Sequence, residues 1–190
     1  MKIIAITSPQ ATDDDASLIK RLLECGVHAV HLRKPEADVH YCRALLRSLT
    51  AVERAKIVIH DYVELYDEFS LMGIHINKNV SVLPEDYRGV RTRSCHSIAE
   101  IKRFKDDYDY LFLSPIFDSV SKVGYKSGIS RDELMLASTQ GIIDEKVIAL
   151  GGVTFDSIPY LDELNFGGVA MIGALYSTDG LESLKTFDIL

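Results

Sequence analysis

Short runs of β-branched and other apolar residues recur along this chain, and each run is followed by a segment with a helical or helix-like pattern. The runs are Lys2–Thr7, Ala29–Leu32, Lys56–Ile59, Gly73–Ile76, Arg91–Cys95, Tyr110–Leu113, Lys146–Leu150 and Gly168–Ile172. Strands that alternate with helical segments form right-handed βαβ units and a parallel sheet. Eight such units predict a closed (β/α)8 TIM barrel, with an open doubly wound sheet as the competing architecture.

The length of the chain limits how this barrel can be built. With 190 residues it is long enough for one well-cored domain, and it lies slightly below the usual size of the (β/α)8 fold. No internal repeat, linker or low-complexity segment divides the sequence. We therefore expect a minimal barrel that forms a single domain over residues 1–190.

Helix-start signals agree with the alternation of strands and helices. Thr12–Asp15 offers several N-caps, and Asp38 and Ser97 are the predicted N-caps of two later helices. A further helix is predicted over Arg131–Thr139. Pro159 is compatible with a helix only in its first turn.

Composition excludes some classes of function. The formal net charge of −7 argues against a general nucleic-acid binder, although a local basic loop can still hold an anion. Cys25, Cys42 and Cys95 fit no zinc or CxxC spacing, and an odd count suits a reducing compartment. A signal-peptide pattern and an apolar run of the ~20 residues needed to span a membrane are both missing from the sequence. We expect a cytoplasmic protein without a membrane or nucleic-acid partner, and its oligomeric state, homo-oligomer or monomer, stays open.

Polar residues collect where the predicted strands end. In a (β/α)8 barrel the active site lies at the carboxyl ends of the strands. The residues at these ends are Thr7, Ser8, His31, Arg33, Lys34, His60, Asp61, Tyr62, Asn77, Lys78, Ser94, His96, Gly151, Gly152 and Gly173. Most are cationic, hydroxyl-bearing or glycine, and few are acidic. The set predicts an anionic small-molecule substrate.

The stretch Tyr108–Ser130 begins as an apolar run that is typical of a buried parallel strand. It then becomes a long loop rich in serine, lysine and glycine. Hydroxyl, ammonium and backbone N–H groups are the donors that a phosphate or diphosphate needs. A flexible Ser/Gly tether is the alternative interpretation.

One pair of glycines and one aspartate each have two interpretations. Gly151, Gly152 and Gly173 follow the last two strands, where such barrels often bind phosphate through backbone N–H groups. The alternative for the glycine pair is an ordinary turn. Asp61 is either a Mg²⁺ ligand that acts together with diphosphate oxygens or a cap of the next helix.

Three histidines at strand ends could be interpreted as a metal cluster. His31, His60 and His96 come from three different strands, and their local spacing does not support a zinc site. Hydrogen bonds to a ligand or to loop backbone are the favoured interpretation.

The strand-end residues also form motifs in a specific order. These are HLRKP at 31–35, IHDY at 59–62, GIHINK at 73–78, SCHS at 94–97, SPIFDSVSK at 114–122, LGGV at 150–153 and GVAMIGAL at 168–175. They resemble the QLRxK, INDR, GVHLGQ, SxH-type, GPIFxTxTK, IGGI and GVxxISAI elements of thiamine-phosphate synthases (thiamine-phosphate pyrophosphorylases) and their thiazole-tautomerase relatives. The resemblance covers nearly the whole chain.

The resemblance implies a transferase reaction of thiamine biosynthesis. An aminopyrimidine methyl diphosphate loses diphosphate, and the ring nitrogen of a thiazole phosphate attacks the freed carbon. By matched position the catalytic residues would be Arg33, Lys122 and Ser94. The substrate-binding residues would be His31, Lys34, His60, His96, Ser119, Ser121, Gly151, Gly152 and Gly173. Asp61 would hold Mg²⁺.

Several positions depart from the family motifs. His31 replaces a glutamine and His60 an asparagine, whereas His75 matches the family's histidine. Val80 lies where a second Mg²⁺-binding aspartate is expected, and Pro115 lies where the tautomerases have their catalytic histidine. The leading interpretation is thiamine-phosphate synthesis. The alternatives are a thiazole-phosphate tautomerase and a catalytically degenerate regulatory or binding paralogue.

Overall fold

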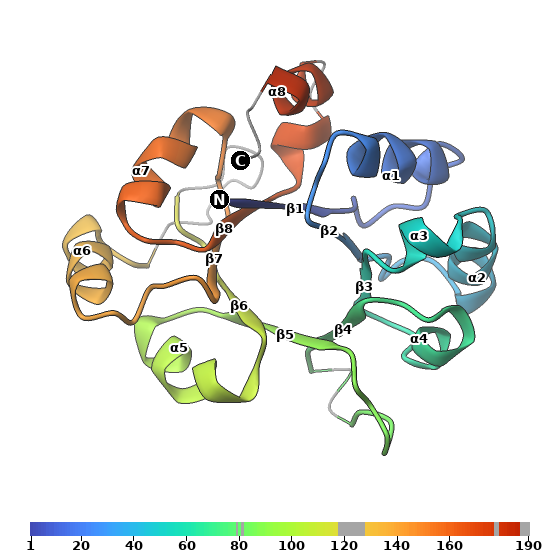
Figure 1. Ribbon diagram of the computed structural model, residues 1–190, viewed down its shortest axis with the longest axis horizontal. Helices are drawn as coiled ribbons and strands as arrows, with labels where there is room; N and C mark the ends of the chain where they lie inside the picture. Colours follow the sequence, from blue (N-terminus) through green and yellow to red (C-terminus); the bar gives the residue numbers. More distant parts are fainter. Residues whose placement is uncertain (79, 81, 118–127, 177–178, 187–190) are drawn as a thin grey trace. The chain divides into compact units, whose positions relative to one another are not determined.

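The computed structural model describes residues 1–78, 80, 82–117, 128–176 and 179–186 (Figure 1). Its strands are hydrogen-bonded in sequence order, β1 to β8, and form a closed barrel. They are β1 (Lys2–Ile6), β2 (Ala29–Leu32), β3 (Ile57–Ile59), β4 (Gly73–Ile76), β5 (Val90–Cys95), β6 (Tyr110–Leu113), β7 (Val147–Leu150) and β8 (Gly168–Met171). This confirms the predicted (β/α)8 barrel and excludes the open doubly wound sheet.

The chain divides into two compact units by its internal contacts. We call Ile4–Arg91 the first unit, and Met1–Ile3 together with Thr92–Leu190 the second unit. The prediction of a single domain over residues 1–190 stays a prediction.

In the first unit, β2 pairs in parallel with both β1 and β3, and β3 pairs with β4. His31 lies level with Val58, and Ile59 lies level with Ile74. The helices that connect these strands are α1 (Asp15–Glu24), α2 (Val39–Arg47), α3 (Ala51–Arg54) and α4 (Glu64–Phe69). All residues of β2 and β3 are buried, as expected for the core of a parallel sheet.

In the second unit, β6 pairs with β5 and β7, and β7 pairs with β8. Its helices are α5 (Ile98–Phe104), α6 (Arg131–Thr139), α7 (Ile158–Glu163) and α8 (Gly180–Thr186), with short 3-10 turns η1 (Lys105–Asp107), η2 (Phe155–Ser157) and η3 (Gly173–Tyr176). All four residues of β6 are buried, which confirms the prediction of a buried strand there.

Most predicted helix starts are observed. The Asp38 carboxylate accepts a hydrogen bond from the Tyr41 N–H at 2.8 Å, and the Ser97 hydroxyl accepts one from the Glu100 N–H at 3.2 Å. Pro159 lies in the first turn of α7. The N-cap of α1 is Asp14, inside the predicted stretch Thr12–Asp15, although it makes no side-chain cap hydrogen bond.

Two further observations complete the fold. The short helix α3, which the apolar pattern did not predict, starts with a capping box. Of the helices in the described ranges, none is both long and apolar enough to cross a membrane.

Candidate functional site

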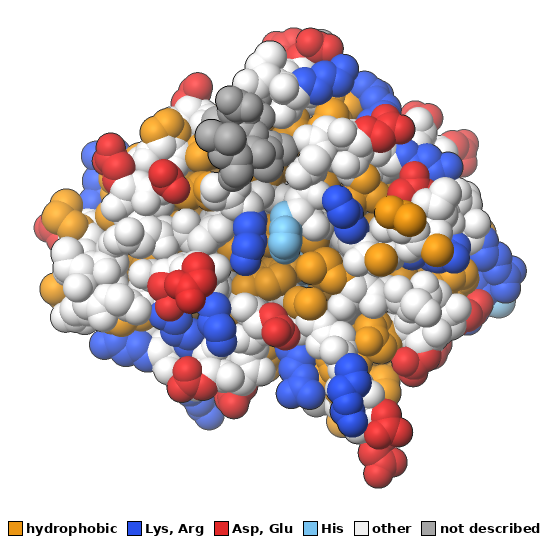
Figure 2. All heavy atoms as spheres, viewed as in Figure 1, with side chains coloured by type: hydrophobic (Ala, Val, Ile, Leu, Met, Phe, Trp, Pro, Cys, Tyr) orange, Lys and Arg blue, Asp and Glu red, His pale blue; other side chains and the backbone are white. Residues whose placement is uncertain are grey.

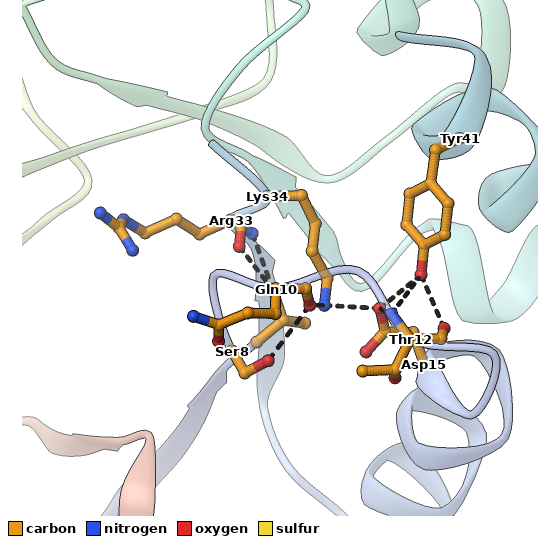
Figure 3. Close-up of polar contacts among 8 residues, drawn as sticks. Ser8, Gln10, Thr12, Asp15, Arg33, Lys34 and Tyr41 are labelled. Atoms are coloured by element: carbon orange, nitrogen blue, oxygen red, sulfur yellow. Dashed lines mark hydrogen bonds and ion pairs between the residues drawn. The ribbon is translucent and has the colours of Figure 1, made fainter. Parts of the chain in front are cut away.

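Two consecutive cationic residues follow β2 and have opposite environments. The Lys34 side chain is fully buried, whereas Arg33 is exposed. Lys34 Nζ lies 2.5 Å from an Asp15 carboxylate oxygen and 2.6 Å from the Gln10 carbonyl oxygen. Figure 3 shows the two side chains extending in opposite directions from adjacent positions. The placement of Lys34 does not support the predicted substrate contact, because its ammonium group is committed to a buried ion pair.

The Lys34–Asp15 pair is extended by Tyr41 of α2. The Tyr41 hydroxyl lies 2.5 Å from Asp15 Oδ2 and 2.8 Å from the Thr12 carbonyl oxygen. Burial alone would raise the pKa of Asp15, but hydrogen bonds from Lys34, Tyr41 and the Thr12 N–H outweigh it and lower that pKa. Burial and the hydrogen bond to Asp15 together raise the pKa of Tyr41. The network therefore holds a charged carboxylate and ties the loops after β1 and β2 to α2.

The backbone of Arg33 is fixed by a residue at the end of β1. The Thr7 hydroxyl accepts a hydrogen bond from the Arg33 N–H at 2.9 Å and lies 3.1 Å from the Arg33 carbonyl oxygen. In the described part of the chain the Arg33 guanidinium forms no ion pair. Its backbone is therefore held while its charge stays available to a ligand.

Asp61 follows β3 and is half-buried. Burial raises its pKa, and the positive charge of Arg33 opposes that shift. The N-cap of α4 is Val63 and makes no side-chain cap hydrogen bond, so Asp61 does not fill the capping role that was its alternative interpretation. A carboxylate near a free guanidinium can hold a cation next to a bound anion.

The residues around Asp61 fit Mg²⁺ binding only with a single carboxylate ligand. Mg²⁺ is usually bound by one or two carboxylates together with phosphate oxygens and water. Val80, where the resemblance places a second aspartate, is buried and pairs with Asn77 through backbone hydrogen bonds. Asp61 would therefore hold the ion as one carboxylate, with the remaining ligands coming from phosphate oxygens and water.

His31 and His60 are brought together, and His75 joins them. His31 Nδ1 lies 2.9 Å from His60 Nε2, and the His60 and His75 rings are stacked with centroids 4.1 Å apart. All three side chains are buried. The metal cluster considered from the sequence contained His96 instead of His75, because local spacing alone does not show which of the two lies beside His31 and His60.

His96 belongs to the second unit and binds loop backbone there. Its ring Nδ1 lies 2.8 Å from the Ser114 carbonyl oxygen, and its backbone N–H donates to a Glu100 carboxylate oxygen at 2.6 Å. This confirms the interpretation of His96 as a histidine that bonds a loop. Ser94 lies in β5, level with Phe112 of β6, and is half-buried.

The glycines after β7 differ from the glycine after β8. Gly151 and Gly152 have φ angles of 92° and 66°, a region that favours glycine. A Cβ at Gly151 would lie 2.8 Å from Pro115 Cα, so the backbones after β6 and β7 need this close approach. Gly173 is different, because a Cβ there would meet no atom within 4 Å. Internal packing therefore explains Gly151 but not Gly173.

Part of the predicted phosphate loop lies outside the described residues. This applies to Lys122, Ser119 and Ser121. The hypothesis that this loop shares one anion with Gly151, Gly152 and Gly173 therefore stays a prediction.

Comparison with known proteins places these features in a family. The family model described as thiamine monophosphate synthase matches residues 3–175. A thiamine-phosphate synthase of Mannheimia succiniciproducens is 24% identical over 193 residues, covering 93% of this chain and 87% of the relative. Among solved structures, the thiamine phosphate pyrophosphorylase of Bacteroides thetaiotaomicron is 35% identical with a TM-score of 0.86, covering 97% of this chain and 94% of that one.

A more distant structure shares the fold. The thiamine phosphate pyrophosphorylase of Pyrococcus furiosus is 18% identical with a TM-score of 0.73, covering 97% of this chain and 92% of that one. The match of the family model over most of the chain, together with the 35% identical structure, decides the assignment. The chain belongs to the thiamine monophosphate synthase family.

Proposed function

We propose that this chain is a thiamine-phosphate synthase, a transferase that joins an aminopyrimidine methyl diphosphate to a thiazole phosphate. The C–O bond to the diphosphate breaks, and the diphosphate leaves with the electron pair. The thiazole ring nitrogen then forms the new C–N bond with the freed methylene carbon. Membership of the family supports the reaction class.

One observation in the first unit carries the catalytic part of the proposal. The Arg33 guanidinium and the Asp61 carboxylate follow neighbouring strands, and neither is paired with another side chain in the described part of the chain. Departing diphosphate develops negative charge, and a positioned guanidinium stabilises such charge more strongly in the transition state than in the ground state. Arg33 would bind the diphosphate, and Asp61 would hold Mg²⁺, which neutralises phosphate charge when bound.

The remaining roles are proposed from matched positions. Lys122 would add a second positive charge to the diphosphate, and Ser94 would lie beside it. Ser119 and Ser121 would contact the phosphates. Gly152 and Gly173 would bind thiazole phosphate through backbone N–H groups, and the absence of steric demand at Gly173 supports a role in ligand approach.

The tautomerase alternative is not favoured. The position of the tautomerases' catalytic histidine is occupied by Pro115, which has no group that can transfer a proton. The curated relatives and the solved structures reported above carry the name thiamine-phosphate synthase or pyrophosphorylase.

The proposed partners are small phosphorylated molecules rather than macromolecules. Figure 2 shows lysine and arginine side chains lying among aspartate and glutamate over α1 to α4 of the first unit. This mixed surface and the net charge of −7 support a protein without a nucleic-acid partner. Cys25, Cys42 and Cys95 are free thiols, which supports a cytoplasmic location.

The test is formation of thiamine phosphate from the two substrates with Mg²⁺ present, measured by chromatography of the product. The same preparation is titrated calorimetrically with thiazole phosphate alone. We expect product formation that needs both substrates. Binding of thiazole phosphate without product formation would contradict the synthase function and favour the catalytically degenerate paralogue.

A further inference from the structure

Three histidines of the first unit lie on one face of the sheet. His31 is on β2, His75 is on β4, and His60 directly follows β3. Because side chains alternate along a strand, His31 shares its face with its neighbour Val58, and Val58 shares its face with His60. The register of β3 and β4, in which Ile59 lies level with Ile74, sets His60 level with His75 when it is continued by one residue. The β2–β3 and β3–β4 pairings thus place the three imidazoles next to one another on the same face of the sheet.

The nitrogen atoms of these imidazoles are close enough to share one ion. One ligand atom from each of His31, His60 and His75 lies within 4.8 Å of the other two. Tetrahedral zinc with Zn–N bonds of about 2.0–2.1 Å separates two ligating nitrogens by roughly 3.4 Å. The 2.9 Å distance between His31 Nδ1 and His60 Nε2 is shorter than this separation. The 4.8 Å within which all three ligand atoms lie is longer than it. Shared ligation also requires ring rotations, because the stacked His60 and His75 rings, 14° from parallel, hold their lone pairs in nearly parallel planes.

Burial favours the neutral form of His31 and His60, which is the form that metal ions require. The exposed fractions of His31, His60 and His75 are 0%, 6% and 3%. Burial, with a smaller electrostatic contribution from the neighbouring His75, holds the pKa values of His31 and His60 well below the usual range. Neutral imidazole is the form that ligates a metal.

The donor chemistry selects the class of ion. Three nitrogen donors without a carboxylate suit zinc and its first-row neighbours, whereas Mg²⁺ requires oxygen ligands. The cluster is therefore different in kind from the proposed Mg²⁺ position at Asp61. Two of its three members, His31 and His60, stand where the family motifs have amide side chains, so the cluster is a property of this chain and not of those motifs.

We propose that His31, His60 and His75 form a three-imidazole site for a divalent transition-metal ion of the zinc type. Three protein ligands leave one coordination position for water or another small ligand, as in zinc sites that are not closed by a fourth side chain. In the metal-free protein the same nitrogens hold one another through the His31–His60 hydrogen bond. The metal replaces that contact, so the apo protein keeps its fold.

The experiment uses the full chain after treatment with a chelator, with Co²⁺ as a spectroscopic probe and Zn²⁺ as a competitor. Tetrahedral Co²⁺ gives intense visible d–d bands. We expect one Co²⁺ per chain, displacement by one equivalent of Zn²⁺, and no displacement by an excess of Mg²⁺. Hyperfine-shifted imidazole proton signals from three histidines in the Co²⁺-loaded wild type would identify the ligands without any substitution.

Variants locate the site. His31→Gln and His60→Asn introduce the amides of the family motifs, and each should weaken Co²⁺ binding by at least about 100-fold, since loss of an outer-shell partner alone costs 10–100-fold. His40→Gln removes an exposed histidine and should leave binding unchanged. Asp61→Asn should also keep Co²⁺ binding, which separates this site from the proposed Mg²⁺ position.

Three results would overturn the proposal. These are no stoichiometric Co²⁺ binding by the wild type, unchanged binding in both His31→Gln and His60→Asn, or loss of binding in His40→Gln. Circular dichroism melting of each apo variant shows whether it is folded. If one variant unfolds, the other variant and the proton signals of the wild type still decide the question.

Discussion

The strand ends of the first unit are characterised by interacting side chains, whereas those of the second unit are characterised by backbone conformation. After β2 and β3, charged and imidazole side chains fix one another, as in the Lys34–Asp15 pair and the His31–His60 hydrogen bond. After β7 and β8, the distinctive features are backbone ones, namely the positive φ angles of Gly151 and Gly152. A site made from side chains depends on charge and protonation, whereas a site made from backbone depends on shape.

This difference sets what each unit should be sensitive to. Removing a charge from a buried pair leaves its partner uncompensated. Adding a methyl group to a glycine in a tight position leaves charge unaltered but forces the backbone to move. The predictions that follow test this contrast, from the largest expected effect to the smallest.

The first prediction removes the buried ammonium of the first unit. Lys34→Met should destabilise the fold by about 3–5 kcal/mol, because the Asp15 carboxylate is left buried without its counter-ion. Denaturant unfolding followed by circular dichroism measures the loss. Lys102→Met, which removes an exposed lysine, is the matched control and should change stability by less than about 0.5 kcal/mol.

The coupling between the two partners sharpens this prediction. The double variant Asp15→Leu, Lys34→Met removes both charges and should lose less stability than the sum of the single variants. Strictly additive losses would show that the pair is not the interaction that holds these loops together.

The second prediction removes a charge that is exposed. Arg33→Ala should lower kcat/KM for thiamine phosphate formation by about 10²–10³-fold, the usual effect of losing one electrostatic donor to the transition state. Its unfolding midpoint should match that of the wild type, because the guanidinium has no ion-pair partner in the described ranges. Arg47→Ala, at another exposed arginine, should leave the rate unaltered. A stable Arg33→Ala enzyme with full kcat/KM would contradict the role of Arg33.

The third prediction compares two glycines of the second unit. Gly151→Ala should cost about 1–3 kcal/mol, since the new Cβ combines a φ of 92° with a 2.8 Å contact to Pro115. Gly173→Ala should have unchanged stability, because its Cβ enters open space. Under the proposed function it should nevertheless weaken thiazole phosphate binding in a calorimetric titration. Equal stability of the two variants would remove the distinction between a structural and a ligand-facing glycine.

The fourth prediction concerns pH and the histidines of the first unit. The pKa values of His31 and His60 are lower in the folded state than the usual 6.5, so below pH 6.5 the unfolded state binds more protons. Stability is therefore complete above pH 6.5 and should fall as the pH drops below it, by up to about 1.4 kcal/mol per pH unit for each histidine.

Substitution shows which histidine causes this dependence of stability on pH. Urea unfolding between pH 7 and pH 5.5 gives the slope for the wild type and for His60→Asn. The variant should show the shallower slope, whereas His40→Gln should keep that of the wild type. A slope that does not depend on His60 would place the proton uptake elsewhere.

The sequence predicted the secondary structure more completely than the site. The predicted run Tyr110–Leu113 coincides with β6, and Asp38 and Ser97 cap the predicted helices, because strand periodicity and capping are local properties. The partnership of Asp15 with Lys34 was not predictable in this way, since it depends on how two loops meet.

The histidine cluster shows the same limit. The sequence places His31 and His60 at strand ends, but which third residue joins them follows from the pairing register of β3 and β4. Local spacing favours neither His75 nor His96. The role of Asp61 was ambiguous for a related reason, because only the observed start of α4 excludes it as a cap.

The Thr7 hydroxyl has a thermodynamic consequence for ligand binding. Because it hydrogen-bonds both the backbone N–H and the carbonyl oxygen of Arg33, it fixes the backbone position from which the Arg33 side chain extends. A ligand that binds Arg33 then reduces the rotational entropy of its side-chain torsions, about 0.5–1.5 kcal/mol for a long side chain, while the Arg33 backbone is already held in place. Ligand association with Arg33 should therefore be fast and should change the order of the Arg33 backbone little.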